Sequence, residues 1–127
     1  MGNLPKILVV EDNPSCQQLW PDMLIDYIEM VFARTIAEAE NLYAQHPDIV
    51  AITVDGSVPR NDNDVIKDGE LTTTPLVHHF RDMGFRGLIV AASSSDESNS
   101  ELMKAGCNAA VVKFDYTDYI RKAFGKN

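Results

Sequence analysis

Residues 6–12, KILVVED, decide the fold prediction. The run Lys6–Val10 is apolar at successive positions and partly β-branched, which suits a parallel strand covered on both faces. Two acids, Glu11 and Asp12, follow the run directly. The Asn-Pro pair that comes next is typical of a helix N-cap followed by proline at the first helical position. The stretch therefore predicts a buried strand that ends in two carboxylates and leads into a helix.

The alternation of strand and helix continues along the chain. Thr35-Ile-Ala-Glu38, after the second apolar run, is a capping box, and Thr74-Pro75, after the third, begins a helix with apolar residues at helical spacing. The predicted strands cover 6–10, 28–33, 48–54, 88–92 and 109–112, and the last predicted helix covers about 117–124. A long polar loop is expected over 56–73. Such alternation predicts an α/β protein with a parallel sheet and helices on both faces.

Composition limits the class of protein. The chain has 127 residues, 45% of them apolar and 24% charged, which is typical of one globular domain. No apolar stretch is long enough to cross a bilayer, and no signal peptide is visible, so we expect a cytoplasmic protein without membrane contact. The net charge of −8 disfavours direct binding to nucleic acid. Cys16 and Cys107 have no ligand-like spacing and are expected to be reduced, buried thiols.

Polar side chains follow four of the predicted strands. They are Glu11 and Asp12 after the first, Asp55 after the third, Ser93 after the fourth and Lys113 after the fifth. Ligand sites in such sheets lie at the carboxyl ends of the strands, so we expect these side chains to converge. Three carboxylates repel one another unless a cation lies among them, and oxygen ligands favour Mg²⁺. A carboxylate can also form an aspartyl-phosphate, while a hydroxyl and an ammonium donate to the phosphoryl oxygens.

This arrangement resembles the receiver domain of two-component response regulators over nearly the whole chain. The matching pieces are the acidic pair in ILVVEDN, the Asp in VDGSVP, the hydroxyl after GFRGLIVAAS, the Lys in AAVVKF and the Ala-Gly pair before the last strand. The resemblance implies a single receiver-like domain over 1–127. Its fold would be a flavodoxin-like, doubly wound, five-stranded parallel sheet with strand order 2-1-3-4-5.

The resemblance implies a phosphoryl-accepting signalling switch that is not an enzyme in the usual sense, with slow self-dephosphorylation at most. Asp55 would be the phosphoacceptor, Lys113 would pair with Asp55 and then with the phosphoryl group, and Ser93 would be the switch hydroxyl. The Mg²⁺ ligands would be Glu11 (directly or through water), Asp12, Asp55 and the backbone carbonyl of Ser57. The partners would be a histidine kinase or phosphotransfer protein and a downstream protein target that the sequence does not name.

Three features depart from the family's pattern and concern the output. Phe114 follows the lysine where proline is usual, and Ala110 stands where a strand-five aromatic commonly acts as a rotameric switch. The loop after Pro59 is longer than usual, and we interpret its charged part as a solvated insertion, although long loops beside a site often carry binding. Phe114 and Ala110 favour an alternative function, a receiver-like domain that no longer switches and serves as a protein-binding module.

The position of the switch hydroxyl depends on how the segment between the fourth strand and the lysine is aligned. If the family's spacing is counted back from Lys113, the switch position falls at Ala91. If the register of the fourth strand, after GFRG, is used, it falls at Ser93. We favour Ser93, because the register of a strand changes less easily than the length of a loop.

Each motif alone could also have an ordinary structural role. The acids, the lysine and the Ser93–Ser95 run could be surface and capping residues, and Asp55 could cap a turn with the glycine that follows it. A Mg²⁺-dependent hydrolase would place a second acid two residues after the nucleophile, where Ser57 stands. A flavin carrier would need a Gly/Ser/Thr-rich phosphate cradle after the first strand, where this chain is acidic. Adjacent His78 and His79 point about 100° apart on a helix and do not form a pair.

Overall fold

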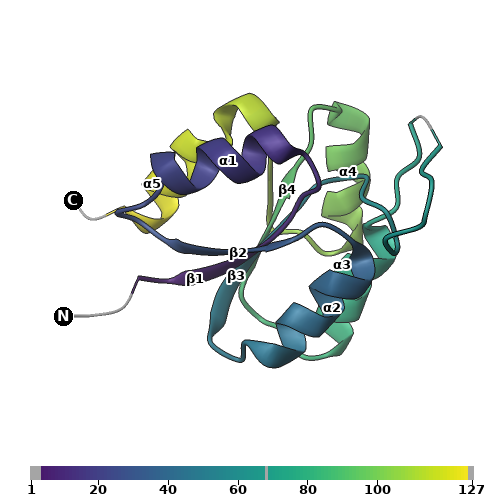
Figure 1. The fold of residues 1–127 in the computed structure, drawn as a ribbon, viewed down its shortest axis with the longest axis horizontal. Coiled ribbons are helices and arrows are strands. Elements are labelled where there is room, and N and C mark those ends of the chain that lie inside the picture. The colour runs from purple at the N-terminus through teal and green to yellow at the C-terminus, as the bar shows by residue number, and fades with distance from the viewer. Residues whose placement is uncertain (1–3, 68, 126–127) are drawn as a thin grey trace.

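The computed structural model describes residues 4–67 and 69–125. Its centre is a five-stranded parallel sheet with the order β2-β1-β3-β4-β5, which confirms the predicted fold class (Figure 1). The strands are β1 (Lys6–Val10), β2 (Glu29–Ala33), β3 (Ile49–Val54), β4 (Leu88–Ala92) and β5 (Ala109–Val111). The helices are α1 (Pro14–Met23), α2 (Ile36–Gln45), α3 (Thr74–Asp82), α4 (Asp96–Ala105) and α5 (Tyr116–Phe124), and a 3-10 turn, η1 (Lys113–Asp115), precedes α5.

Helices cover both faces of the sheet, as the sequence predicts. In Figure 1, α1 and α5 lie together on one face, and α2 and α3 lie on the other. The first layer buries Trp20 and Ile120 against the sheet, and the second, which includes α4, buries Phe80 and Leu102. This double cover explains why Ile7–Val10 is apolar at every position, since none of these four side chains is exposed.

Side chains cap the first turns of α1 and α2 and so mark where these two helices begin. Asn13 Oδ1 accepts a hydrogen bond from Ser15 N at 2.8 Å, and proline follows Asn13, as predicted. At the start of α2, Thr35 Oγ1 accepts from Glu38 N at 3.0 Å. The reciprocal half of the expected capping box is different, because the Glu38 carboxylate accepts from Arg34 N at 2.7 Å and not from Thr35 N. The side chain therefore reaches one residue further back than a capping box requires.

Some predicted boundaries differ by one residue. Strands β2 and β3 begin one residue later than expected, and β5 ends at Val111. The edge strand β5 pairs with β4 alone, over Ala109–Val111, so nothing on its other side extends it. Pro21 lies inside α1, two residues before the helix ends, and it cannot donate the backbone hydrogen bond that this position would make to the preceding turn.

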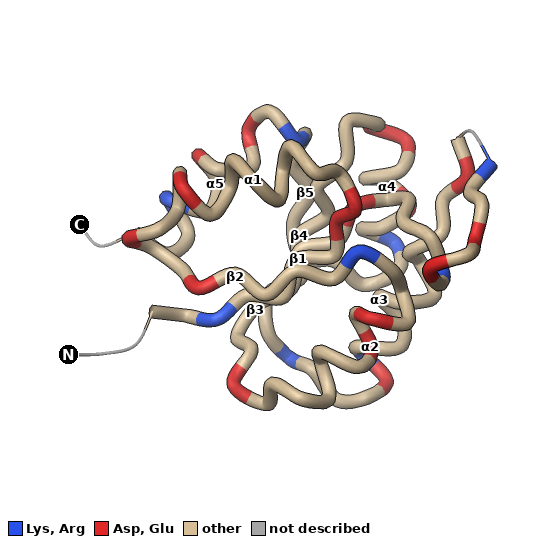
Figure 2. Tube along the Cα trace, in the orientation of Figure 1, with Lys and Arg blue, Asp and Glu red and all other residues tan. Residues whose placement is uncertain are grey.

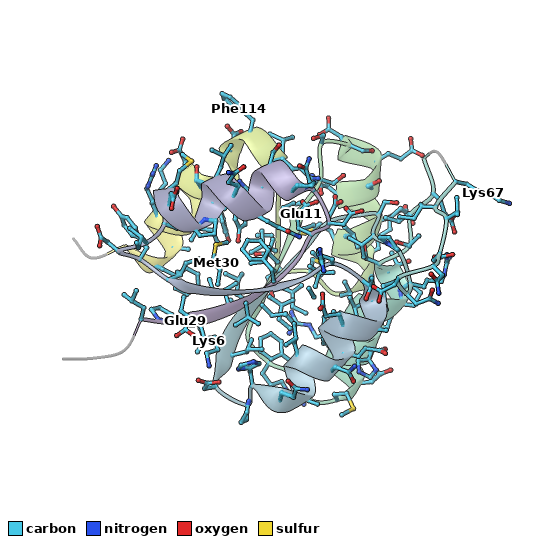
Figure 3. All side chains as sticks on the ribbon, viewed as in Figure 1. Lys6, Glu11, Glu29, Met30, Lys67 and Phe114 are labelled. Atoms are coloured by element: carbon cyan, nitrogen blue, oxygen red, sulfur yellow. The ribbon has the colours of Figure 1, made fainter. Side chains whose placement is uncertain are left out.

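The loop between β3 and α3 is anchored at both ends. At its start, the carbonyls of Pro59 and Arg60 accept hydrogen bonds from the first two amides of α2, at 2.9 and 3.0 Å. At its end, Thr72 N donates to Gly56 O at 2.9 Å. Between these points the loop extends away from the sheet, with Lys67 pointing outward near its tip (Figures 1 and 3). Among the described residues, no helix is long and apolar enough to cross a membrane.

Candidate functional site

The site begins with the alignment of β1 and β3. Val10 and Val54, the last residues of these strands, are register partners, and Asp55 N donates to Val10 O at 3.0 Å. Glu11 and Asp55 therefore leave neighbouring strands at the same edge of the sheet. Figure 2 shows the acidic segment that follows β1 at this edge.

The predicted acids meet there. One carboxylate oxygen each from Glu11, Asp12 and Asp55 lies within 4.8 Å of the other two. Glu11 is 1% exposed and Asp55 is 8% exposed, while Asp12 is partly exposed. Two of the three negative charges are thus nearly removed from water, which costs free energy unless a positive charge compensates them.

Lys113 supplies one positive charge. Its Nζ lies 3.0 Å from Glu11 Oε1 and 3.4 Å from Asp55 Oδ2. The predicted pairing of Lys113 with Asp55 is present, but the nearer carboxylate is that of Glu11. Lys113 is hydrogen-bonded to Glu11 Oε2 at 3.2 Å, whereas Glu11 Oε1 has no hydrogen bond of good geometry among the described residues.

Burial and the neighbouring charges together shift the pKa values of Glu11, Asp55 and Lys113. Burial, and then repulsion from Asp55, raises the pKa of Glu11, although Lys113 opposes the change. Burial also raises the pKa of Asp55 despite the nearby Lys113. Burial alone would lower the pKa of Lys113, but the charges of Asp55 and Glu11 outweigh it and raise that pKa. One ammonium therefore does not fully compensate the three carboxylates, and a divalent cation with oxygen ligands fits this donor set.

A cavity of about 210 Å³ opens beside the Asp55 carboxylate. Three residues that the sequence predicts for the site line it, namely Asp55, Ser57 and Ser93. Gly69 and Glu70, from the far part of the long loop, form another part of its wall. The cavity leaves room for a phosphoryl group next to Asp55. It also shows that the insertion is more than a solvated loop, because part of it borders the site.

The two candidate positions for the switch hydroxyl lie in different environments. Ser93 follows directly after β4, is 7% exposed and lines the cavity, and its Oγ accepts from Ser95 N at 3.1 Å. Ala91 is fully buried in the core and pairs with Val54 in the sheet. The structure thus places Ser93, and not Ala91, at the cavity, while the role of Ser93 stays a prediction.

Two threonines that the sequence predicts only as part of the long loop bind the chain segment that follows β3. Thr73 Oγ1 donates to Asp55 O at 2.6 Å, and Thr72 Oγ1 both accepts from Val58 N and donates to Val58 O, at 2.9 and 2.7 Å. Both threonines are buried. The run of three threonines before Pro75 is the signal in the sequence that could have identified them.

A buried aromatic also lies beneath the site, although β5 carries none. Tyr116, from the first turn of α5, is fully buried, and its hydroxyl lies 2.7 Å from Thr53 Oγ1, two residues before Asp55. Its ring lies 4.2 Å from that of Trp20, between centroids. Ala110 is exposed on β5, and Phe114 is 94% exposed and projects away from the protein (Figure 3).

The remaining candidates have ordinary environments. His78 is exposed, and His79 Nδ1 lies 3.9 Å from Glu40 Oε2 on the outer side of the helices. Both cysteines are free thiols, with Cys107 buried and Cys16 only half-buried. Burial raises the pKa of Cys107 to about 12, which makes it unreactive at neutral pH.

Known proteins resemble this chain in structure. No protein-family model matches the chain, and no curated protein matches it in sequence. Solved structures do match it. The phosphorylated cyanobacterial phytochrome response regulator RcpA superposes with a TM-score of 0.75 at 18% identity, covering 96% of this chain and 94% of that one. The chain has the receiver-domain fold.

Two further solved structures share this fold. The Vibrio cholerae chemotaxis protein CheY4 gives a TM-score of 0.74 at 21% identity, covering 95% of this chain and 96% of that one. The BeF3-activated N-terminal receiver domain of Klebsiella pneumoniae RstA gives 0.71 at 21% identity, covering 95% and 99%. At such identities the likeness to receiver domains concerns the fold, and the roles of individual residues must be argued from the geometry of this site.

Proposed function

We propose that this chain is a phosphoryl-accepting signalling domain in which Asp55 receives a phosphoryl group with the help of Mg²⁺. The observation that carries the proposal is the position of the Asp55 carboxylate, which is buried among two other acids and Lys113 and borders a cavity. The donor would be a histidine kinase or a phosphotransfer protein in the cytoplasm, and the phosphorylated form would act on a downstream protein.

The acids have separate tasks in this proposal. Glu11, Asp12 and Asp55 would hold Mg²⁺, and the carbonyl of Ser57 is a further candidate because Ser57 lines the same cavity. The bound ion would neutralise charge on the phosphoryl oxygens and on the acids. The burial of both Glu11 and Asp55 beside the single ammonium of Lys113 supports the binding of a further positive charge at this cluster.

Asp55 would act as the nucleophile. Gly56 N donates to Asp55 Oδ1 at 2.8 Å, and Lys113 Nζ lies 3.4 Å from Oδ2, so the carboxylate has a defined orientation. One carboxylate oxygen would bond to the phosphorus atom while the bond from phosphorus to the donor breaks, and the donor leaves with that electron pair. Hydrolysis of the acyl phosphate regenerates Asp55, so the domain is modified in each cycle and does not turn over as an ordinary enzyme does.

Lys113 and Ser93 would bind the transferred group. The Lys113 ammonium can move from the carboxylates to a phosphoryl oxygen, and the Ser93 hydroxyl, at the cavity wall, can donate to another. Both contacts exist only when the phosphoryl group is present, which is the differential interaction that a two-state switch requires.

The alternative is a receiver-like module that binds a protein without switching. Phe114 favours this alternative, because an aromatic side chain that is 94% exposed would be removed from water by a partner protein that covered it. Ala110 favours it as well, since a methyl group has no rotamer to change.

Phosphorylation by acetyl phosphate separates these functions. We expect the wild-type protein to gain one phosphoryl group in intact-mass measurements with Mg²⁺, and to gain none with chelator. Asp55→Asn should abolish the gain, whereas Asp82→Asn, the same change at an exposed position of α3, should leave it unchanged. Absence of modification in wild type with Mg²⁺ would favour the binding module.

A further inference from the structure

Asn99, on α4, makes an unusual set of contacts for a side chain in a helix. It is 6% exposed. Its Oδ1 accepts from Ser93 N at 3.1 Å, and its Nδ2 donates to Ser93 O and to Val111 O, each at 3.1 Å. The amide thus uses its acceptor and two donor contacts, which a buried polar group needs if its burial is to be tolerated.

These contacts lie where the sheet ends. The pairing of β4 with β5 stops at Ala92 and Val111. Asn99 joins the two chain segments at this edge, by binding both backbone groups of Ser93 and the carbonyl of Val111. The side chain therefore continues the connection between the strands where the backbone ladder no longer provides it.

The two residues that Asn99 connects lead to the proposed phosphoryl-binding groups. Ser93 carries the hydroxyl at the cavity wall, and Lys113 follows Val111 by two residues. None of the three contacts of Asn99 involves Glu11, Asp12 or Asp55. A change at Asn99 is thus expected to displace the Ser93 hydroxyl and the Lys113 ammonium directly, while the three acids keep the backbone positions that β1 and β3 give them.

We propose that Asn99 is a positioning residue that sets the distance between the Ser93 hydroxyl and the Lys113 ammonium. The proposal rests on the proposed function, because it assigns Asn99 a task in phosphoryl transfer to Asp55. Groups that stabilise a transferred phosphoryl must be preorganised, and small displacements are costly. Because Asn99 belongs to α4, any shift of Ser93 toward the phosphoryl group is also transmitted directly to this helix.

Asn108 provides a matched control. Its side-chain oxygen accepts from Ile89 N at 2.8 Å and so holds the backbone of β4 in the same way, but near the amino end of the strand. It also accepts from Arg81 Nη2 at 2.7 Å. Asn108→Ala removes one side-chain hydrogen bond from Ile89 of β4 and one from Arg81, and it affects stability without approaching the site.

The test compares two quantities in the full chain, the rate of phosphorylation by acetyl phosphate at saturating Mg²⁺ and the affinity for Mg²⁺ by calorimetry. We expect Asn99→Ala to reduce the rate by about 10- to 100-fold, the scale of a misplaced transition-state contact. Mg²⁺ affinity should not fall, because the displaced Lys113 ammonium is a cation beside the acids and not a metal ligand. Asn108→Ala should retain both wild-type values even if it unfolds at a lower temperature.

Asn99→Ser adds no charge and keeps a polar side chain that is too short for all three contacts, and it serves if Asn99→Ala does not fold. It should likewise reduce the rate without a loss of Mg²⁺ affinity. A wild-type rate in a folded Asn99 variant would overturn the inference and leave the proposed function intact. A parallel loss of rate and Mg²⁺ affinity would show a general structural role and would also overturn it. If the wild type itself is not phosphorylated, the proposed function fails, and the inference fails with it.

Discussion

Lys113 is paired more closely with Glu11 than with Asp55, across 102 positions of the sequence. The ammonium belongs to the segment after β5 and reaches the acid that follows β1. In the sheet, β1 lies beyond β3, the strand that leads to Asp55. In this state Lys113 offsets the charge of the most deeply buried acid of the site. If the Lys113 ammonium moved to a phosphoryl oxygen, the metal ion would be the remaining positive charge beside Glu11. We therefore expect metal binding and phosphorylation to support each other.

The metal site can be tested through Asp12. Asp12→Asn removes a charged oxygen ligand from the cluster, and we expect Mg²⁺ affinity to fall by at least about 10-fold, since even outer-shell partners of metal ligands contribute that much. Isothermal calorimetry measures the effect, and Asp82→Asn is the control. Equal affinities in wild type and Asp12→Asn would remove Asp12 from the metal site.

The raised pKa values of Glu11 and Asp55 predict how stability depends on pH without metal. An acid with a raised pKa in the folded state holds its proton over a range in which the unfolded chain has lost it, so the free energy of unfolding falls as pH increases through that range. The range begins near the ordinary values of 3.8 for Asp and 4.5 for Glu. The resulting loss of stability is therefore complete at pH values above the raised pKa values.

Asp55→Asn isolates this effect. With chelator present, the variant should be more stable than wild type near neutral pH, because burial raises the pKa of Asp55, and the difference in stability should shrink toward pH ~4. Thermal unfolding over a pH series measures both. If Asp55→Asn were less stable than wild type at neutral pH without metal, ionised Asp55 would not destabilise the folded state.

The phosphoryl-dependent loop can be tested with Ser93→Ala. We expect beryllofluoride to shift the amide resonances of residues 93–96 in wild type, because the hydroxyl gains a partner only when the phosphoryl mimic is present. In Ser93→Ala these shifts should shrink while those around Asp55 persist. Identical shifts in both proteins would exclude Ser93 as the switch. Shifts confined to the metal site in both would favour the protein-binding module.

The hydrogen bond beneath the site predicts a coupled loss of stability. Tyr116→Phe leaves Thr53 Oγ1 buried without its partner, which should lower the free energy of unfolding by about 1–3 kcal/mol. Thr53→Val in that background removes the unpaired group and should recover part of the loss. Chemical denaturation of the four proteins of the cycle measures the coupling. Strictly additive effects would show that the two hydroxyls do not interact.

The sequence predicts the sheet and the acidic cluster because both depend on local patterns. Continuous apolar runs such as Ile7–Val10 identify a strand covered on both faces, and a residue just after such a run must lie at the edge of the sheet. Because Glu11 and Asp55 each follow a predicted strand, the sequence predicts that both carboxylates lie at the same edge of the sheet. The register of β4 likewise places Ser93, and not Ala91, at the cavity.

No pattern within a single segment of the sequence predicts the other contacts of the site. The partners Thr53 and Tyr116 are 63 positions apart, and Asn99 reaches Val111 across two elements. Such contacts depend on how α4 and α5 pack on the sheet, which no pattern within a single segment reveals. A buried asparagine in a helix is an ordinary residue in sequence, and only its partners show what it does.

The most direct measurement is the location of the phosphoryl group. Acetyl phosphate and Mg²⁺ are added, the acyl phosphate is reduced with borohydride to homoserine, and the modified position is identified by peptide mass spectrometry. The proposal predicts homoserine at position 55 and nowhere else. A phosphoryl group on His78 or His79, or an unmodified Asp55 in a chain that has bound Mg²⁺, would contradict it.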